Sequence, residues 1–150
     1  MSLIVYLSGE IHTDWRQKII EGANQQNLDI RFTSAVTNHD ASDAAGDHLG
    51  EESTGFWRDH KSAKINAIRT KTLIEKSDLV VVRFGEKYKQ WNAAFDAGYA
   101  AALNTPLIVM HDGALTHPLK EVDGAALAVA ETADQIVRIL RYVIKGELKD

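Results

Sequence analysis

Asp96 is the residue of this sequence that most needs a chemical explanation. It lies within the string NAAFDAGYAAA, among small and apolar residues where an apolar side chain would pack better. A helix advances by about 100° per residue, so Asp96 would share one stripe with Asn92 and Tyr99. A carboxylate held there can attack an electrophilic carbon or stabilise an oxocarbenium-like centre. The alternative is an ordinary exposed acid on a surface helix.

Two features of the same helix favour the chemical interpretation. The helix N-terminus carries the positive end of the helix dipole and would help to keep Asp96 ionised. Gly98 costs about 1 kcal/mol of helix stability relative to alanine, which predicts that some other group approaches the helix closely there.

Short apolar strands and amphipathic helices alternate along the chain and must position this acid. The expected strands are 3–7, 29–33, 78–84, 107–110 and 125–129. The expected helices are 14–26, capped by Thr13 or Asp14, then 62–76, 91–103 and 132–145, with loops over 34–60 and 111–121. Continuous apolar strands separated by helices are typical of a parallel sheet that is covered on both faces. The sequence therefore predicts one α/β domain over residues 1–150, a flavodoxin-like three-layer sandwich with a five-stranded parallel sheet in the order 2-1-3-4-5.

Ligands of such sheets bind beyond the carboxyl ends of the strands, where the strand order reverses. This rule selects the segments 8–15, 85–92 and 111–120, together with a loop from the long polar region that could close over a substrate. The candidate binding residues are Gly9, Glu10, His12, Arg16, His39, Asp40, Gly85, Lys87, Lys89, Trp91, Asn92 and His117. Tyr6, on the first strand, could donate its hydroxyl to Asp96.

Several of these candidates have an equally simple structural interpretation. Arg16 and the two lysines could be solvated surface residues, and His117 could be a surface histidine. Trp91 could stack on a base, but it could also fill the core at the start of its helix. Gly9 would allow the backbone to approach a ligand closely.

Composition excludes several classes of function. The formal charge of −4 and the pI near 5.8 give no reason to expect binding to a nucleic-acid polymer. The chain has no cysteine, and its apolar runs are shorter than the roughly 20 residues of a membrane helix. It lacks the GxGxxG, GxxxxGK[ST] and GxSxG motifs. We therefore expect a cytoplasmic protein that does not bind membranes.

Three strings together resemble the nucleoside 2-deoxyribosyltransferase family: YLSGEI, SDLVVVRF and FDAGYAAALNTPLIV. The hallmarks of that family are a YLAGP-like first strand and turn, an acid that opens the third strand, and E-x-G-x-A in the following helix. The strings GEIH, NHD, FGEKYKQWN and HPLKE are similar to the YtoQ branch of the family. The resemblance extends over roughly the whole chain.

The resemblance implies that Asp96 stands where the family has the glutamate that takes the deoxyribosyl C1′ and releases the base. Aspartate is one methylene shorter, and a displacement of about 1 Å can cost on the order of a hundredfold in rate. Gln90 stands where transferases carry an acid or serine, and Thr70 where they carry an aspartate. Substrate recognition is therefore expected to differ from that of the transferases.

Three functional hypotheses follow. The first is an enzyme that cleaves or transfers at the N-glycosidic bond of a nucleoside or nucleotide through the Asp96 carboxylate, without a metal or redox cofactor. The second is a non-catalytic module that binds a nucleoside or nucleotide, and the third is a metal-dependent hydrolase that uses the loop Asn38–His39–Asp40. The resemblance also implies a homo-oligomer, because family members are commonly oligomers in which a neighbour helps to complete the site.

Overall fold

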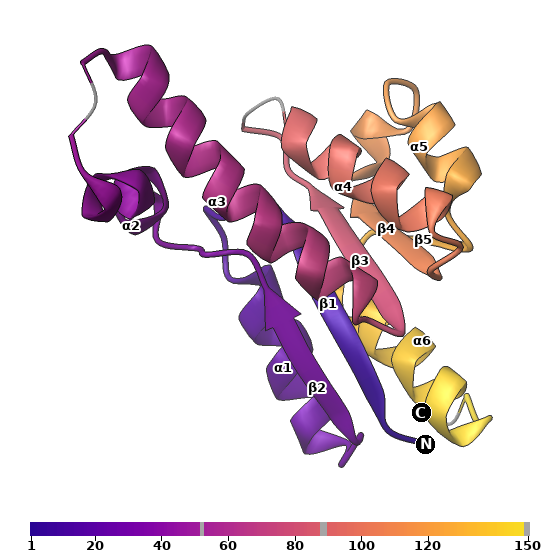
Figure 1. Ribbon diagram of the computed structural model, residues 1–150. Coiled ribbons are helices and arrows are strands. Elements are labelled where there is room, and N and C mark those ends of the chain that lie inside the picture. The colour runs from indigo at the N-terminus through magenta and orange to yellow at the C-terminus, as the bar shows by residue number, and fades with distance from the viewer. Residues whose placement is uncertain (52, 88–89, 149–150) are drawn as a thin grey trace.

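A single five-stranded parallel sheet in the order β2-β1-β3-β4-β5 forms the centre of the computed structural model (Figure 1). This order and the helices on both faces confirm the predicted flavodoxin-like architecture. The structure describes residues 1–51, 53–87 and 90–148, with the backbone alone for His39 and Leu49. In chain order the elements are β1 Leu3–Gly9, α1 Trp15–Gln25, β2 Ile30–Ser34, α2 His39–Asp43, the 3-10 helix η1 Ala44–Leu49, α3 Gly55–Glu75, β3 Leu79–Phe84, α4 Trp91–Ala102, β4 Leu107–His111, the 3-10 helix η2 Gly113–Leu115, α5 Lys120–Ala125, β5 Ala128–Ala130 and α6 Ala133–Lys145.

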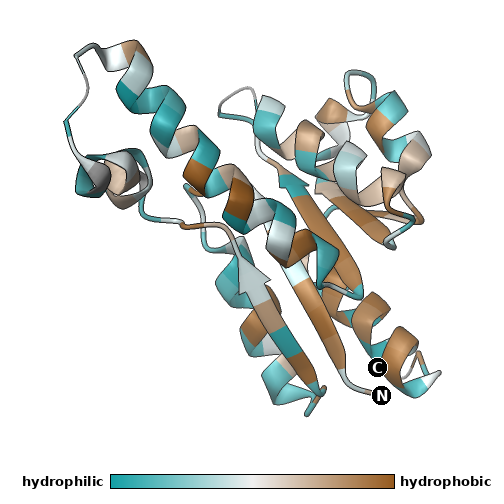
Figure 2. Ribbon diagram, in the orientation of Figure 1, coloured by the Kyte–Doolittle hydropathy of each residue, from teal (hydrophilic) through white to brown (hydrophobic). Residues whose placement is uncertain are grey.

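The two faces of the sheet carry separate hydrophobic cores. Val5 and Leu7 of β1 pack with α1 and α6 on one face, while Tyr6 packs with α3 and α4 on the other. Successive strand residues point to opposite faces, so this alternation follows from the strand geometry. The central strands are hydrophobic over most of their length, as Figure 2 shows, because both of their faces are covered.

The polar region that we expected to be one loop from residue 34 to residue 60 contains regular structure. It forms α2 and η1, and α3 begins earlier than predicted, at Gly55. Thr54 is the N-cap of α3, because its side chain accepts a hydrogen bond from the Trp57 amide. Ser62 of α3 ties this region down, since its hydroxyl donates to the Asp43 carbonyl and accepts from the Gly46 amide. The segment therefore has a fixed place beside α3, as Figure 1 shows.

The predicted loop 111–121 likewise contains η2 and the start of α5. An ion pair links β4 to α5, since His111 Nε2 lies 2.8 Å from Asp123 Oδ2. The other ring nitrogen, His111 Nδ1, lies 2.7 Å from the Asp112 carbonyl oxygen. Burial alone would lower the pKa of His111, but these two acceptors and the nearby Glu131 raise it above its ordinary value. Both ring nitrogens face acceptors, so the geometry suits the imidazolium form.

We expect this ion pair to make stability pH-dependent. A raised histidine pKa contributes stability below about pH 6.5, and that contribution is lost as the pH rises through the folded-state value. Urea unfolding at a series of pH values should therefore show the free energy of unfolding falling above pH 6.5. In Asp123→Asn the free energy of unfolding should be about 1.5 kcal/mol lower than in the wild type at pH 6, and it should fall less as the pH rises. An equal slope in both proteins would contradict this role.

The described residues include no helix that is both long enough and apolar enough to span a membrane.

Candidate active site

A pocket of about 890 Å³ lies between α3 and α4, beyond the carboxyl end of β1. Two of the three segments selected by the switch-point rule, 8–15 and 85–92, contribute to the lining, whereas 111–120 does not. Most of the lining comes from the β1–α1 turn, the region of α2, the inner face of α3 and the start of α4. The lining residues are Ser8, Gly9, Glu10, Ile11, His12, Ala35, Ser42, Asp43, Asp59, Ser62, Ala63, Asn66, Ala67, Thr70, Lys71, Gln90, Trp91, Asn92, Ala93, Phe95, Asp96 and Tyr99.

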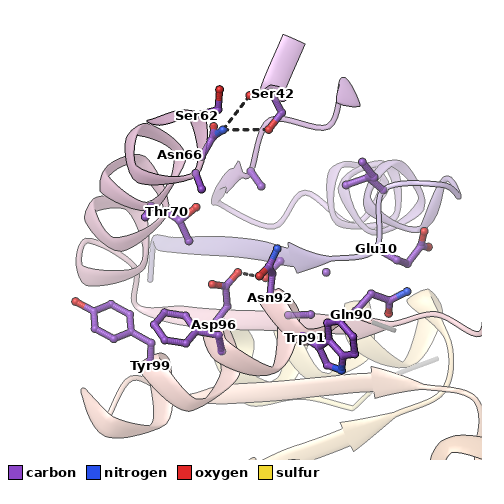
Figure 3. Close-up of a pocket in the computed structure, with 18 of the residues that line it drawn as sticks. Glu10, Ser42, Ser62, Asn66, Thr70, Gln90, Trp91, Asn92, Asp96 and Tyr99 are labelled. Carbon is purple, nitrogen blue, oxygen red and sulfur yellow. Dashed lines mark hydrogen bonds between the residues drawn. The ribbon is translucent and has the colours of Figure 1, made fainter. Parts of the chain in front are cut away.

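Asp96 lies in the wall that α4 contributes, and its carboxylate points toward α3 (Figure 3). Its side chain accepts a hydrogen bond of 2.6 Å from the Ser8 hydroxyl at Oδ2. Burial raises the pKa of Asp96 above its ordinary value, and the hydrogen bond from Ser8 opposes part of that rise. Asn92 and Tyr99 line the same pocket, as the helical spacing predicted. The acid is half-buried rather than an ordinary exposed one.

Tyr6 is fully buried, lies outside the pocket lining and does not donate to Asp96. Its hydroxyl has no hydrogen-bond partner among the described residues, although Thr70 lies close enough to act on it. Burial raises the pKa of Tyr6, the nearby Thr70 hydroxyl lowers it, and the charge of Asp96 raises it further. The hydroxyl therefore stays protonated and available as a donor.

The Glu10 carboxylate is held by hydrogen bonds within the turn between β1 and α1. It accepts hydrogen bonds from the His12 amide at 2.7 Å, the Thr13 amide at 3.1 Å and the Thr13 hydroxyl, and Arg83 Nε lies 3.3 Å away. Burial would raise the pKa of Glu10, but these hydrogen bonds and the Arg83 charge outweigh burial and hold it below its ordinary value. Glu10 lines the pocket, and its hydrogen bonds hold the turn that precedes α1. Asp14 is the N-cap residue of α1, as one of the two expected candidates, but its side chain makes no cap hydrogen bond.

The Arg16 guanidinium is held by backbone carbonyl oxygens at the end of β1. It donates to the carbonyl oxygens of Leu7, Gly9 and Glu10, at 3.3, 3.1 and 2.6 Å, and it stacks on the Trp15 ring. Arg16 lies outside the pocket lining and is buried rather than solvated. Sequence could not reveal this role, because it depends on where the end of β1 meets α1.

Two glycines bring the strand ends together at the pocket. Gly9 has a φ of +124°, and a Cβ there would lie 2.1 Å from the Arg83 carbonyl oxygen. A Cβ on Gly85 would lie 3.0 Å from Glu10 Cγ, and the Gly85 amide donates to the Gln90 side chain at 2.6 Å. Protein atoms therefore leave little room for a side chain at either position. Gly9 lines the pocket, whereas Gly85 lies outside the lining.

The close approach that we expected at Gly98 is not made by another part of the described chain. No atom of the described chain outside its own helix lies within 4 Å of a Cβ built there, and the residue is exposed. Packing against other elements of the described chain therefore does not explain why α4 has a glycine at this position.

The other predicted binding residues divide into three groups. His12, Trp91 and Asn92 line the pocket, and Trp91 is 75% exposed, which excludes the alternative of a core residue. The structure places Asp40, Lys87 and His117 outside the lining, although Ser42 and Asp43 bring the same polar region over the pocket. The side chain of His39 and the whole of Lys89 lie outside the described residues.

The sequence analysis singled out Thr70 as a departure from the family pattern, but it did not identify the polar stripe of α3 to which Thr70 belongs, and it did not identify Ser8. Ser62, Asn66 and Thr70 form a polar stripe along the pocket side of α3, and Figure 3 shows Asn66 and Thr70 on the wall opposite Asp96. Their spacing of four residues could have revealed this stripe. Ser8 was also missed, although YLSG differs from the YLAG of the family pattern at this residue.

The described residues include no group of three or more histidine, cysteine, aspartate or glutamate side chains that could hold a metal ion. For the loop Asn38–His39–Asp40, the structure shows the backbone of a short helix with Asn38 as its cap, whose side chain accepts from the Ala41 amide at 2.9 Å.

Comparison with known proteins agrees with the fold and covers nearly the whole chain. The family model described as Nucleoside 2-deoxyribosyltransferase YtoQ matches residues 6–144. The uncharacterized protein YtoQ of Bacillus subtilis (strain 168) is 43% identical over 148 residues, which are 98% of this chain and 100% of that protein. The solved structure of a 2-deoxyribosyltransferase from Bacillus psychrosaccharolyticus shares the fold with a TM-score of 0.51 at 15% identity, over 89% of this chain and 90% of the other. The chain therefore belongs to the nucleoside 2-deoxyribosyltransferase YtoQ family.

Proposed function

We propose that this protein cleaves or transfers at the N-glycosidic bond of a nucleoside or nucleotide, with the Asp96 carboxylate acting on the anomeric carbon. The observation that carries the proposal is the position of Asp96, half-buried in the wall of a pocket large enough for such a ligand. Membership of the YtoQ family and the shared fold with a 2-deoxyribosyltransferase support the substrate class.

In the proposed reaction, Asp96 attacks C1′ of the sugar. A bond forms between the free carboxylate oxygen and C1′ while the C1′–N bond breaks, and its electron pair leaves with the base. His12, which lines the same pocket, is a candidate to supply the proton that the departing base takes up. Water or a second base then attacks C1′ and gives its proton to the group that protonated the first base, while the carboxylate leaves with its electron pair.

The electrostatics of the pocket suit this chemistry. Only the ionised form of Asp96 is a nucleophile, and burial makes that form less solvated and therefore more reactive, while its pKa rises. Trp91 and Phe95 present exposed aromatic faces at the pocket, on which a base could stack.

A panel of (deoxy)nucleosides and their 5′-monophosphates tests the proposal against its alternatives. We expect free base to appear in chromatography of the reaction mixture. Tight binding by calorimetry without release of base would favour the non-catalytic binding module. Chelator-sensitive release of phosphate would favour the metal-dependent hydrolase of the Asn38–His39–Asp40 loop.

We also propose that the protein is a homo-oligomer assembled through α3 and α4. Large apolar side chains are exposed on these helices: Phe56, Trp57 and Ile68 on α3, and Trp91 and Phe95 on α4. A second copy that packs on these helices would remove apolar surface, above all that of α3, from water.

Light scattering coupled to size-exclusion chromatography tests this assembly. The wild-type protein should have a mass that is a multiple of 16.6 kDa, and Ile68→Glu should shift it toward one chain. Leu127→Glu, which also replaces an exposed apolar residue but lies at the β5 edge, should leave the mass unchanged. A monomeric wild-type protein would contradict the proposal.

A further inference from the structure

We propose that Ser8 is a positioning residue that fixes the Asp96 carboxylate for attack and leaves Oδ1 as its reacting oxygen. This inference rests on the proposed function, which it extends by assigning a role to a residue of β1 that does not react itself. The hydrogen bond from Ser8 Oγ to Asp96 Oδ2, at 2.6 Å, carries the inference.

Ser8 is held firmly enough to orient another side chain. It is 1% exposed, it lies in β1 between Tyr6 and the turn that starts at Gly9, and its neighbour in the register of β3 is Val82. A side chain on a central strand of a sheet has little freedom to move, whereas Asp96 lies on a helix surface that borders an open pocket. The hydrogen bond therefore transfers the rigidity of the sheet to the carboxylate.

The same hydrogen bond makes the two carboxylate oxygens different. Oδ2 accepts from Ser8, which is the one hydrogen-bond partner that Asp96 has in the described part of the chain. Oδ1 keeps its lone pairs for an incoming carbon. A charge-assisted hydrogen bond of this length favours the ionised carboxylate, so Ser8 also opposes the effect of burial on the acid.

A positioning role explains how a short acid could serve in this pocket. Aspartate has one torsion fewer than glutamate between backbone and carboxylate, so once Ser8 holds Oδ2 the carboxylate plane has little remaining freedom. Well-oriented groups gain rate because the reacting atoms are held close to their attack geometry before the reaction starts.

The test compares Ser8→Ala with Ser8→Thr, which retains a hydroxyl on the strand. In Ser8→Ala we expect kcat for base release to fall about tenfold to a hundredfold, with KM changed by less than about threefold. The acid side of the pH–rate profile should move to higher pH, because the ionised form loses its donor. Ser8→Thr should recover most of both effects.

A direct measurement separates this inference from the proposed function. The pKa of Asp96, followed by NMR of the ¹³C-labelled carboxyl group, should rise in Ser8→Ala whether or not the protein releases any base. Ser77→Ala is the matched control, because Ser77 donates to the Leu73 carbonyl at 2.7 Å outside the pocket, and it should change neither readout. An unchanged Asp96 pKa in Ser8→Ala, or an unchanged kcat in a protein that is active, would overturn the role of Ser8.

Discussion

Replacing Asp96 by asparagine is expected to lower the rate of base release on the order of a thousandfold or more. The amide has nearly the same shape and can still accept the hydrogen bond from Ser8, but it lacks the negative charge that attacks or stabilises C1′. Initial rates on the best substrate of the panel measure the effect. Asp134→Asn, which removes an exposed acid of α6 paired with Arg138, should retain the wild-type rate.

The same substitution should not destabilise the protein. The pKa of Asp96 is raised in the folded state, so the stability that the protonated acid provides below about pH 3.9 is lost as the pH rises through the raised value. At neutral pH, Asp96→Asn should therefore unfold at the same temperature as the wild type or at a higher one. A loss of activity together with a lower unfolding temperature would point instead to a structural role for Asp96.

Gly9→Ala is expected to have the largest effect on stability, lowering the free energy of unfolding by about 3 kcal/mol. Its φ of +124° is unfavourable for alanine, and the new Cβ would lie 2.1 Å from the Arg83 carbonyl oxygen. Since both atoms belong to the backbone at the ends of β1 and β3, the strands must separate to relieve the contact. Chemical unfolding monitored by circular dichroism measures the loss.

Gly98→Ala is the matched control for that prediction. Nothing in the described chain outside the helix lies within 4 Å of the new Cβ, and alanine favours a helix interior, so we expect stability to rise by about 1 kcal/mol. If both alanine variants were equally stable, the close approach of β1 and β3 at Gly9 would not restrict the fold.

The sheet could be predicted because its strands carry their own signal. β3 and β4 are apolar in nearly every position, and only a strand covered on both faces needs that composition. The start of α3 carries no such signal. Phe56, Trp57 and Arg58 are all exposed there. Because the first turns of α3 have no buried face, their hydrophobic residues do not show the helical periodicity from which a helix is predicted.

The site could be predicted in part. Asp96 stood out because a charge in an alanine-rich helix is unusual, and the switch-point rule placed the pocket. The roles of Glu10 and Arg16 could not be read from the sequence, because a buried carboxylate and a buried guanidinium look like any others until their partners are known. Ser8 was missed for a similar reason, since its partner Asp96 is 88 residues away along the chain.

Base release by the wild-type protein and by Asp96→Asn, measured side by side on the same panel, decides whether the Asp96 carboxylate acts on the anomeric carbon. We expect free base from at least one nucleoside or 5′-monophosphate with the wild-type protein, and release near background with Asp96→Asn. No release from any compound of a broad panel, or equal release by the two proteins, would contradict this role of Asp96.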